Sequence, residues 1–205
     1  MTKRLNAKKK ISRKMGASLW GQAKDPFAKK NYRPGQHGKS PKGRGTDYGT
    51  QLRAKQKMKF CYGNISEKQF YNTFQLASST KGDVSENFIG LLESRLDSVV
   101  YRANFVPTVF AARQFVSHKH VTVNGKTVNI ASYRLKIGDV VQIKEKSRKM
   151  AVTIDALQKM ERDIPSYLLL DKDNFTIKLH MQPSFAEVPY ATEMQPHLIT
   201  EFYSR

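Results

Sequence analysis

Residues 91–145 read LLESRLDSVVYRANFVPTVFAARQFVSHKHVTVNGKTVNIASYRLKIGDVVQIKE, and this stretch decides the fold. The apolar residues between Leu92 and Val100 recur at helical spacing, which predicts one amphipathic helix. Pro107 ends that helix, because proline disfavours the helical conformation in the residue before it. A second helix follows, and Thr108 is suited to cap its first turn.

A strand and a tight turn come after the second helix. Residues 121–123 alternate between apolar and polar side chains, as a half-buried strand does. Asn124-Gly125 predicts a hairpin, since a type I′ turn needs positive φ at both central residues. Gly138-Asp139 predicts a second turn, and residues 140–143 a further strand. We therefore expect a small α/β unit that presents one polar, basic face.

The composition favours a polyanionic partner. The chain has 205 residues and a formal net charge of +19, which suits nucleic acid or an anionic membrane surface. Its single cysteine, Cys61, excludes a disulfide framework and a zinc cluster built on cysteines. The pair His118-x-His120 could bind a metal, but we expect these side chains to lie on the surface or face RNA. No apolar run reaches the ~20 residues of a membrane helix.

Most of the excess charge lies in the first quarter of the chain. Residues 1–59 hold 18 Lys and Arg against two acids, whereas the remaining 146 residues hold 18 against 15. Such a segment buries little apolar surface, so we expect an arm that becomes ordered on its partner. A solvated tail is the alternative. The interleaved aromatics, Trp20 and Tyr32 among them, favour stacking on bases.

The N-terminus also bears on the compartment. It lacks the apolar core of a secretory signal, and it is basic and poor in acids, as an organelle transit peptide is. Because the basic character continues far beyond a presequence, we expect a cytoplasmic protein.

The rest of the chain predicts further helices and strands. Residues 47–90 are expected to be helical, with a capping box at Ser66-x-x-Gln69. Beyond the opening stretch we expect, in order, a basic patch at 146–149, a helix at 152–162, strands at 167–170 and 174–179, and a short helix at 197–203. The basic patch is either a solvated loop or an added phosphate contact.

Catalysis has weak support. Glu93 and Asp97 lie four residues apart, and paired carboxylates can act as acid and base. The neighbouring Arg95 and Arg102 make salt bridges the ordinary explanation. Nucleophile-elbow and phosphate-binding loop motifs are absent from the sequence, so we expect no enzyme activity.

Two sets of motifs resemble a known family. The opening stretch, and VTVNGKTVN above all, resembles the S-four RNA-binding module, which several kinds of RNA-binding protein share. The segment PGQHG at 34–38 and the string from Thr46 to Lys57 resemble the N-terminal signature of the bacterial ribosomal protein S-four family. Residues 82–87 and the C-terminal 197–204 extend the resemblance over essentially the whole chain.

The resemblance implies an α+β fold with an inserted αL-type S-four module and a small antiparallel sheet. It implies three domains: a basic extended arm at 1–46, a discontinuous helical domain at 47–90 plus 180–205, and the S-four RNA-binding domain at 91–179. Some members bind zinc through N-terminal cysteines, which this chain lacks, so we expect a metal-free form without a cofactor.

The family is a structural component of the small ribosomal subunit and a primary binder of its ribosomal RNA. It nucleates assembly of the subunit body at a multi-helix junction in the RNA's 5′ domain. Its contact with ribosomal protein S-five bears on decoding accuracy. It also helps to line the messenger RNA entry site, where Lys42 and Arg44 match its basic residues and Lys39 lies nearby. Some members repress their own messenger.

The candidate RNA-binding residues combine positive charge, polarity and position in these motifs. In the arm and the first helix they are Arg4, Lys8, Lys9, Lys10, Arg13, Lys14, Arg33, Gln36, His37, Lys39, Lys42, Arg44, Arg53, Lys55 and Lys57. In the module they are Arg95, Arg113, His118, Lys119, Asn124, Lys126, Asn129, Ser132 and Arg134. Asn124 could instead serve only its turn, and Arg102 could be a plain surface charge.

Two other readings remain open at this point. One is a separate RNA-binding factor carrying the S-four module and acting in ribosome rescue or assembly. The other is an RNA-modifying enzyme with this module, which would need a second domain with a catalytic signature.

Overall fold

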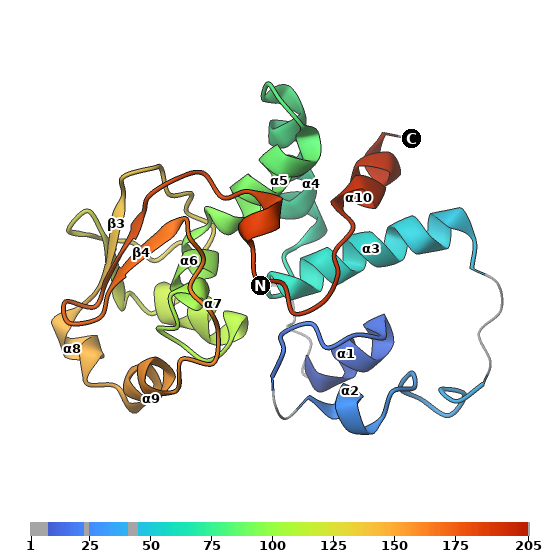
Figure 1. The fold of residues 1–205 in the computed structure, drawn as a ribbon, viewed down its shortest axis with the longest axis horizontal. Helices are drawn as coiled ribbons and strands as arrows, with labels where there is room; N and C mark the ends of the chain where they lie inside the picture. Colours follow the sequence, from blue (N-terminus) through green and yellow to red (C-terminus); the bar gives the residue numbers. More distant parts are fainter. Residues whose placement is uncertain (1–7, 23–24, 41–44, 205) are drawn as a thin grey trace. The chain divides into compact units, whose positions relative to one another are not determined.

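The computed structural model describes residues 8–22, 25–40 and 45–204. The chain forms two compact units: residues 1–65 with 190–205 make unit 1, and residues 66–189 make unit 2 (Figure 1). Helices and one sheet occur together, so the predicted α+β class is confirmed. The three functional domains expected from the resemblance stay a prediction.

Unit 1 is organised around α3 (Asp47–Cys61), which confirms the helix expected from residue 47. The Thr46 side chain caps it by accepting a hydrogen bond from the Gly49 amide at 3.1 Å. The C-terminal α10 (Pro196–Tyr203) packs along α3. Gln51 donates to the Glu201 carboxylate at 2.9 Å across this contact. Residues far apart in the sequence thus complete one core.

The N-terminal segment contains two helices, α1 (Lys8–Met15) and α2 (Pro26–Lys29). Ile11 and Leu19 are only 4% and 2% exposed, and α1 contacts α3. The Trp20 indole donates to the Cys61 carbonyl at 3.2 Å. The prediction of an extended arm is therefore wrong for the segments that form α1 and α2. The apolar side chains between the charges bury against the rest of unit 1.

Unit 2 begins with the antiparallel pair α4 (Glu67–Ser79) and α5 (Val84–Glu93). The predicted cap is confirmed, because the Ser66 hydroxyl accepts from the Gln69 amide at 3.3 Å. Phe88 meets Phe70 and Phe74 edge to face, with ring centroids 5.0 and 5.9 Å apart. These aromatic contacts hold the pair together.

The single helix predicted across 92–106 is wrong. α5 ends at Glu93, and a separate helix, α6 (Leu96–Arg102), follows. Ser94 keeps a helical backbone conformation, whereas Arg95 is extended because it pairs with Arg134 on a distant segment. The Leu96 amide donates to the Tyr133 carbonyl at 2.8 Å, and the Leu135 amide donates to the Ser94 carbonyl at 2.8 Å. α7 (Val109–Ser117) comes next, capped by Thr108 as predicted.

The sheet has the order β2-β1-β3-β5-β4, and every pair is antiparallel. Its strands are β1 (Val121–Val123), β2 (Lys126–Thr127), β3 (Val140–Ile143), β4 (Leu168–Asp171) and β5 (Thr176–Leu179). Asn124 and Gly125 have φ of 49° and 77°, so the predicted turn is confirmed. Val141, Ile143 and Ile177 are fully buried, and α6 and α7 lie on one side of the sheet (Figure 1).

Three short elements complete unit 2. Most of the basic patch at 146–149 forms α8 (Glu145–Arg148), which differs from the solvated loop that was one of its two interpretations; the phosphate contact stays a prediction. α9 (Ala151–Lys159) ends at Met160, which adopts the left-handed conformation with φ of 38°. A 3-10 turn, η1, spans Phe185–Glu187. Across the described part of the chain, we find no helix with the length and apolar character needed to cross a membrane.

Candidate nucleic-acid interface

Unit 1 contains a hollow lined by cationic side chains. One part, of about 260 Å³, is lined by Arg13, Lys14, Arg33 and Lys39 together with polar and glycine residues. An adjoining part, of about 230 Å³, is lined by Lys14, Arg33 and Arg53. Among the residues that the structure describes, no acidic side chain lines either part. We call these five cations and the space between them the basic cleft.

The turn at residues 34–38 shapes the basic cleft. Gly35 has φ of 106°, a conformation that favours glycine. A Cβ added at Gly38 would lie 1.9 Å from the Arg33 carbonyl oxygen, so this position requires glycine. The Gly38 amide closes the turn by donating to the Gly35 carbonyl at 3.2 Å. The PGQHG motif is thus a compact backbone turn that presents Arg33 and Lys39.

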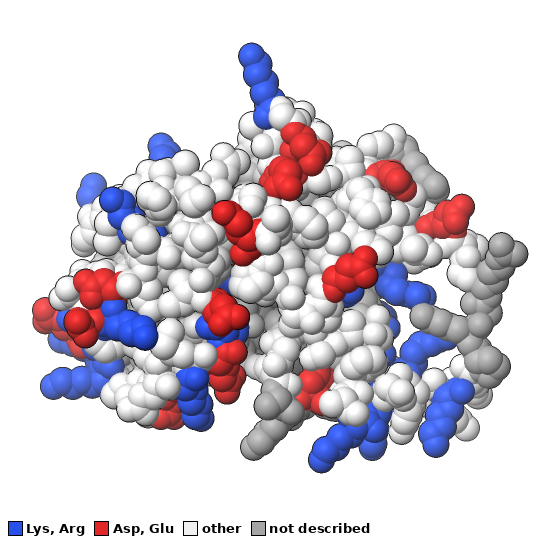
Figure 2. Space-filling model, viewed as in Figure 1, with Lys and Arg blue, Asp and Glu red and all other residues white. Residues whose placement is uncertain are grey.

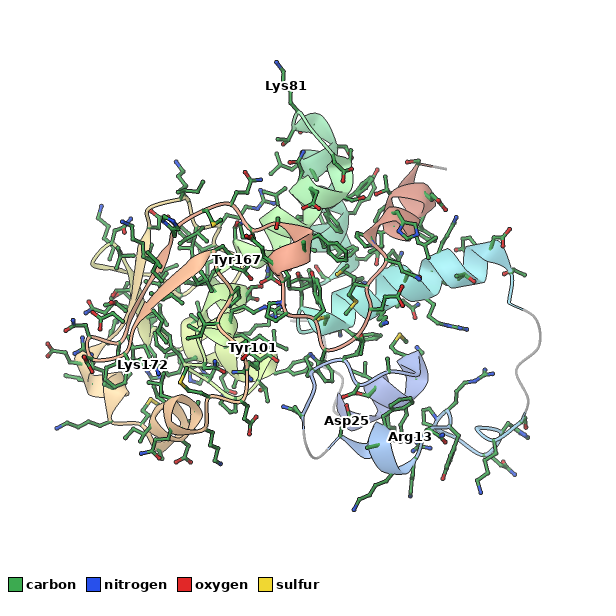
Figure 3. All side chains as sticks on the ribbon, in the orientation of Figure 1. Arg13, Asp25, Lys81, Tyr101, Tyr167 and Lys172 are labelled. Carbon is green, nitrogen blue, oxygen red and sulfur yellow. The ribbon has the colours of Figure 1, made fainter. Side chains whose placement is uncertain are left out.

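Arg13 joins α1 to this turn (Figure 3). Its guanidinium donates to the carbonyls of Tyr32 and Arg33 at 3.1 and 3.2 Å. The Tyr32 ring lies 4.7 Å from the Arg13 guanidinium carbon and 5.4 Å from the Lys39 Nζ. Cation–π attraction therefore brings two cations close together without an acid. The sequence pointed to Tyr32 only as a base-stacking residue, and this positioning role was missed.

Seven of the described candidates in unit 1 are exposed: Lys10, Lys14, Arg33, Gln36, His37, Lys39 and Arg53. Figure 2 shows cationic side chains gathered on the edge of unit 1 that carries α1 and the segment after it. Arg4, Lys42 and Arg44 lie outside the described residues. Lys8 and Lys9 fall within α1, but their side chains are not described.

Two predicted lysines on α3 are less available. Lys55 is 8% exposed, and its Nζ lies 4.2 Å from the centre of the Phe202 ring. Lys57 is half-buried and donates to the Glu193 carbonyl. Burial lowers the pKa of Lys57, and the nearby Glu193 opposes that shift. Both lysines hold α3 against the C-terminal segment of unit 1.

In unit 2, two arginines form buried ion pairs. Arg95 is 4% exposed and binds both carboxylate oxygens of Asp97, at 3.0 and 2.8 Å. Arg102 binds both oxygens of Glu93 in the same way, at 3.1 and 2.8 Å. Tyr167 also donates to Glu93, at 2.9 Å (Figure 3). The carboxylates considered for catalysis are therefore held by structural partners, and Arg102 is no surface charge.

The module's remaining candidates lie at the surface around α7 and the hairpin. His118, Lys119, Lys126, Asn129 and Arg134 are exposed, and Ser132 is half-buried. Arg113 is partly exposed and lies 3.6 Å from Asp97. Asn124 accepts from the Val140 amide at 2.9 Å and donates to Asp139 at 2.8 Å. Its carboxamide thus ties the hairpin turn to β3.

His118 and His120 do not form a metal site of the usual kind. Their ring centres lie 6.1 Å apart, and His120 Nδ1 lies 2.9 Å from the Ser147 hydroxyl oxygen. Within residues 8–22, 25–40 and 45–204, no three His, Cys, Asp or Glu side chains are grouped to hold a metal. Desolvation, reinforced by His118 and Lys144, lowers the pKa of His120.

Comparison of the sequence with known proteins shows which family the chain resembles. Residues 3–93 match the family described as "Ribosomal protein S4/S9 N-terminal domain", and residues 94–141 match the "S4 domain". The chain is 55% identical to the small ribosomal subunit protein uS4 of Brucella abortus (strain S19), with all of both chains covered. The chain belongs to the uS4 family. The uS4 protein of Brucella anthropi is 54% identical, also over the full length of both chains.

The uS4 membership confirms the recognition made from PGQHG and VTVNGKTVN. The matched S4 domain contains α6, α7 and the β1–β2 hairpin. The other match contains the whole basic cleft. Each of the two surfaces described above therefore lies within a segment that the family shares.

Proposed function

We propose that this uS4-family chain is a structural component of the small ribosomal subunit that binds the subunit's ribosomal RNA directly. The observation that carries this proposal is the basic cleft, where five cations gather with no acid in the lining. Unpaired cations concentrated in a hollow attract the phosphates of a folded RNA. Full-length identity of 55% to small-subunit uS4 proteins supports that choice of RNA.

The two surfaces contribute differently to binding. The basic cleft neutralises phosphates and releases counterions, which supplies affinity that depends on salt. The module's surface is rigid. Its backbone is fixed by the sheet, by the Asn124 hydrogen bonds to β3 and the turn before it, and by the two buried arginine ion pairs. Duplex RNA offers mainly shape, 2′-hydroxyls and backbone to such a surface. The module therefore contributes position and selectivity more than net charge.

The exposed and partly exposed candidates form the proposed contact set, apart from Asn124 and Lys57, whose polar groups bind within the fold. In unit 1 they are Lys10, Arg13, Lys14, Arg33, Gln36, His37, Lys39 and Arg53. In unit 2 they are Arg113, His118, Lys119, Lys126, Asn129, Ser132 and Arg134. Arg95 and Lys55 are left out, because each is almost completely buried and already has a partner within its unit.

The finer roles rest on the family resemblance. We propose that the protein is a primary binder that nucleates assembly of the subunit body at a multi-helix junction in the 5′ domain. We also propose contacts with ribosomal protein S-five that bear on decoding accuracy, and with messenger RNA at the entry site. The protein acts in the cytoplasm, within the ribosome, and not as an enzyme. The arm, the discontinuous helical domain and the S-four domain are its proposed functional parts.

A charge-matched comparison tests RNA binding by the cleft. One variant replaces Lys14, Arg33 and Arg53 by Gln, and a control replaces Lys68, Lys81 and Lys172, which are exposed lysines of unit 2. Binding to small-subunit ribosomal RNA is measured from low to moderate salt. If each cleft residue neutralises one phosphate, the slope of log affinity against log salt falls by about 2 to 3 in the cleft variant. The control should keep the parental slope.

Equal losses in the two variants would show general charge attraction and contradict a specific cleft. A complementary measurement is sedimentation of a cell extract after a high-salt wash. The protein should remain stoichiometric with small subunits, and its recovery in the soluble fraction would contradict the ribosomal assignment.

A further inference from the structure

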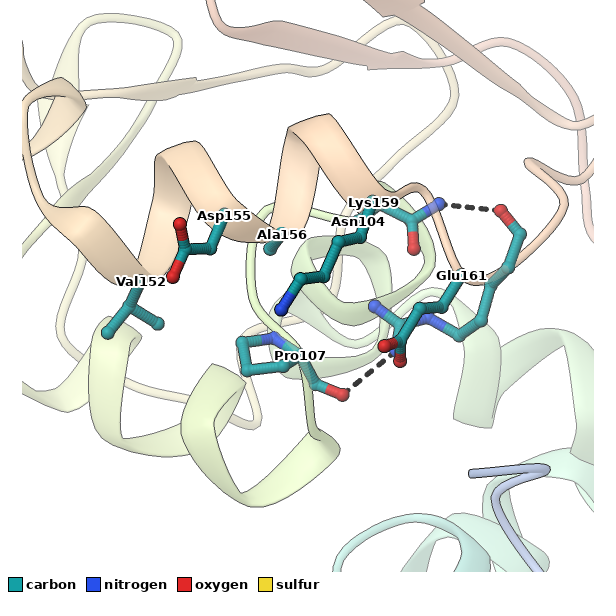
Figure 4. Close-up of a pocket in the computed structure, with 8 residues that line it drawn as sticks. Asn104, Pro107, Val152, Asp155, Ala156, Lys159 and Glu161 are labelled. Atoms are coloured by element: carbon teal, nitrogen blue, oxygen red, sulfur yellow. Dashed lines mark hydrogen bonds between the residues drawn. The ribbon is translucent and has the colours of Figure 1, made fainter. Parts of the chain in front are cut away.

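A pocket in unit 2 lies outside the surfaces assigned above. It has a volume of about 180 Å³ and is formed by α9 and the turn that precedes α7 (Figure 4). Its apolar walls are Pro107, Val152 and Ala156, and polar side chains close the remaining sides. None of its lining residues belongs to the proposed RNA contact set.

Two buried polar atoms at this pocket have no hydrogen-bond partner among the described residues: Asn104 Oδ1 and Arg162 Nε. Asn104 is 1% exposed and is one of the residues that line the pocket (Figure 4). Its Nδ2 donates to the Arg162 carbonyl at 2.7 Å, which fixes the amide and leaves the oxygen unused. A buried polar atom without a partner is costly and rare in native proteins. A ligand that donates to Asn104 Oδ1 would remove that cost.

Arg162 is held rigidly beside Asn104. Its two terminal nitrogens donate to the carbonyls of Pro107 and Val106 at 2.9 and 2.8 Å. The guanidinium carbon also lies 4.1 Å from the centre of the Tyr101 ring. The orphan Nε–H is therefore a fixed donor, and the planar guanidinium is a fixed surface on which a flat group can stack.

The charge of the pocket differs from that of the basic cleft. Lys159 and Arg162 are balanced by Asp155 and Glu161, so the lining has no net charge. A phosphate placed here would meet two carboxylates, and an ammonium group could not accept from Arg162 Nε. The suitable ligand is a neutral, flat group that carries a donor next to an acceptor.

We propose that this pocket binds a single unstacked nucleobase. Every nucleobase carries a donor and an acceptor on adjacent positions of its polar edge, and proteins read such bases by stacking and by edge contacts. The donor would bind Asn104 Oδ1 and the acceptor Arg162 Nε, while the ring lies against Pro107 and Val152. This assignment rests on the proposed function, since RNA at the module brings unpaired bases near. A free nucleotide would offer the same chemistry.

The test uses the full chain and four probes: adenosine, guanosine, cytidine and uridine. Binding is followed by chemical-shift changes of backbone amides at residues 104–107 and 152–162. Val152→Trp fills the pocket from its exposed rim and should weaken nucleoside binding about tenfold, as expected for loss of one stacked base. Ile154→Trp is the matched control on the same helix, outside the pocket lining, and should bind as the parent does.

Asn104→Gly is a second variant, because glycine tolerates the φ of 57° at this position. It should also weaken binding. Shifts spread over the cationic surfaces, or equal affinities in Val152→Trp and Ile154→Trp, would overturn the assignment. Shifts caused by N-methylacetamide and by no nucleoside would also overturn it, and would indicate a peptide carboxamide instead.

Chemical probing of the small-subunit ribosomal RNA distinguishes the source of the base. If the base belongs to RNA, one nucleotide protected by the parent becomes reactive with Val152→Trp while total RNA affinity remains. If nucleosides bind but no such nucleotide exists, the ligand is a free nucleotide. Loss of all RNA binding by the parent would refute the proposed function, whereas intact RNA binding without nucleoside binding would refute only this pocket.

Discussion

The basic cleft of unit 1 and the buried ion pairs of unit 2 use the same residue type for opposite purposes. In the cleft, Arg33 and Arg53 are exposed and no acid lines the hollow. In unit 2, Arg95 and Arg102 are buried, and each binds a carboxylate with two hydrogen bonds. The difference teaches that an arginine's role depends on whether the fold supplies it with an acid. The cleft arginines are available to an external anion, and the buried ones are not.

Removing the acid from a buried pair should produce the largest effect. Glu93→Ala leaves the Arg102 guanidinium and the Tyr167 hydroxyl without their shared partner, and it should lower the free energy of unfolding by about 3–5 kcal/mol. Urea denaturation followed by circular dichroism measures this. The control is Glu161→Ala, which removes an exposed carboxylate and should change stability very little. If both variants lost the same stability, burial would not distinguish the two kinds of site.

Disturbing the turn of the cleft should have a smaller effect. Gly38→Ala forces a Cβ against the Arg33 carbonyl and should cost about 1–3 kcal/mol, as overpacking does. Because the turn presents Arg33 and Lys39, RNA affinity should fall as well. Gly16→Ala is a useful comparison, since a Cβ there meets no atom within 4 Å, although its φ of 72° still causes backbone strain. If Gly38→Ala bound RNA with unchanged affinity, the conformation of this turn would not contribute to RNA binding.

Neutralising one cleft arginine should affect binding and not folding. Arg33→Gln should weaken RNA binding by about 1 kcal/mol or less at moderate salt and reduce the salt slope by about 0.7 to 0.9. Its melting temperature should match that of the parent, because no acid depends on Arg33 in the cleft lining. A large drop in melting temperature would mean that Arg33 is structural, as Arg95 is.

The smallest expected effect is the dependence of stability on pH that arises from His120. Desolvation lowers its pKa, so the folded protein binds fewer protons at this site than the unfolded chain does. The site's contribution to stability is therefore present above the ordinary histidine pKa of about 6.5 and decreases as the pH falls below it. NMR titration of the His120 imidazole checks the direction of this shift. A pKa above the ordinary value would contradict it.

Local features were predictable from the sequence. The Ser66 and Thr108 caps and the Asn124-Gly125 turn each depend on residues within a few positions of one another. The same is true of the motifs that revealed the family. In contrast, the break between α5 and α6 depends on hydrogen bonds to residues 131–135, and helical periodicity carries no trace of that pairing. Tertiary contacts overrode the local preference there.

For the candidate site, too, the sequence predicted individual residues but not the tertiary contacts between them. The cations of the basic cleft were named, but their convergence was not predictable, because Arg53 meets Arg33 only after α1 and α3 pack. Arg95 was named as an RNA-binding candidate, but it is buried and binds Asp97 with two hydrogen bonds; the sequence indicated a salt bridge there and gave no sign of its burial. The pocket beside Asn104 gave no sequence signal, since its lining comes from two segments about fifty residues apart.

The packing of α10 against α3 also constrains the order of events during synthesis. Residues 196–203 leave the translating ribosome after all of unit 2, yet α3 lacks its C-terminal packing partner until they arrive. Domains usually fold in the order in which they are made. Here unit 2 can fold first, although residues 1–65 of unit 1 are made before it. The core of unit 1 can therefore be completed only after residues 196–203 have been made.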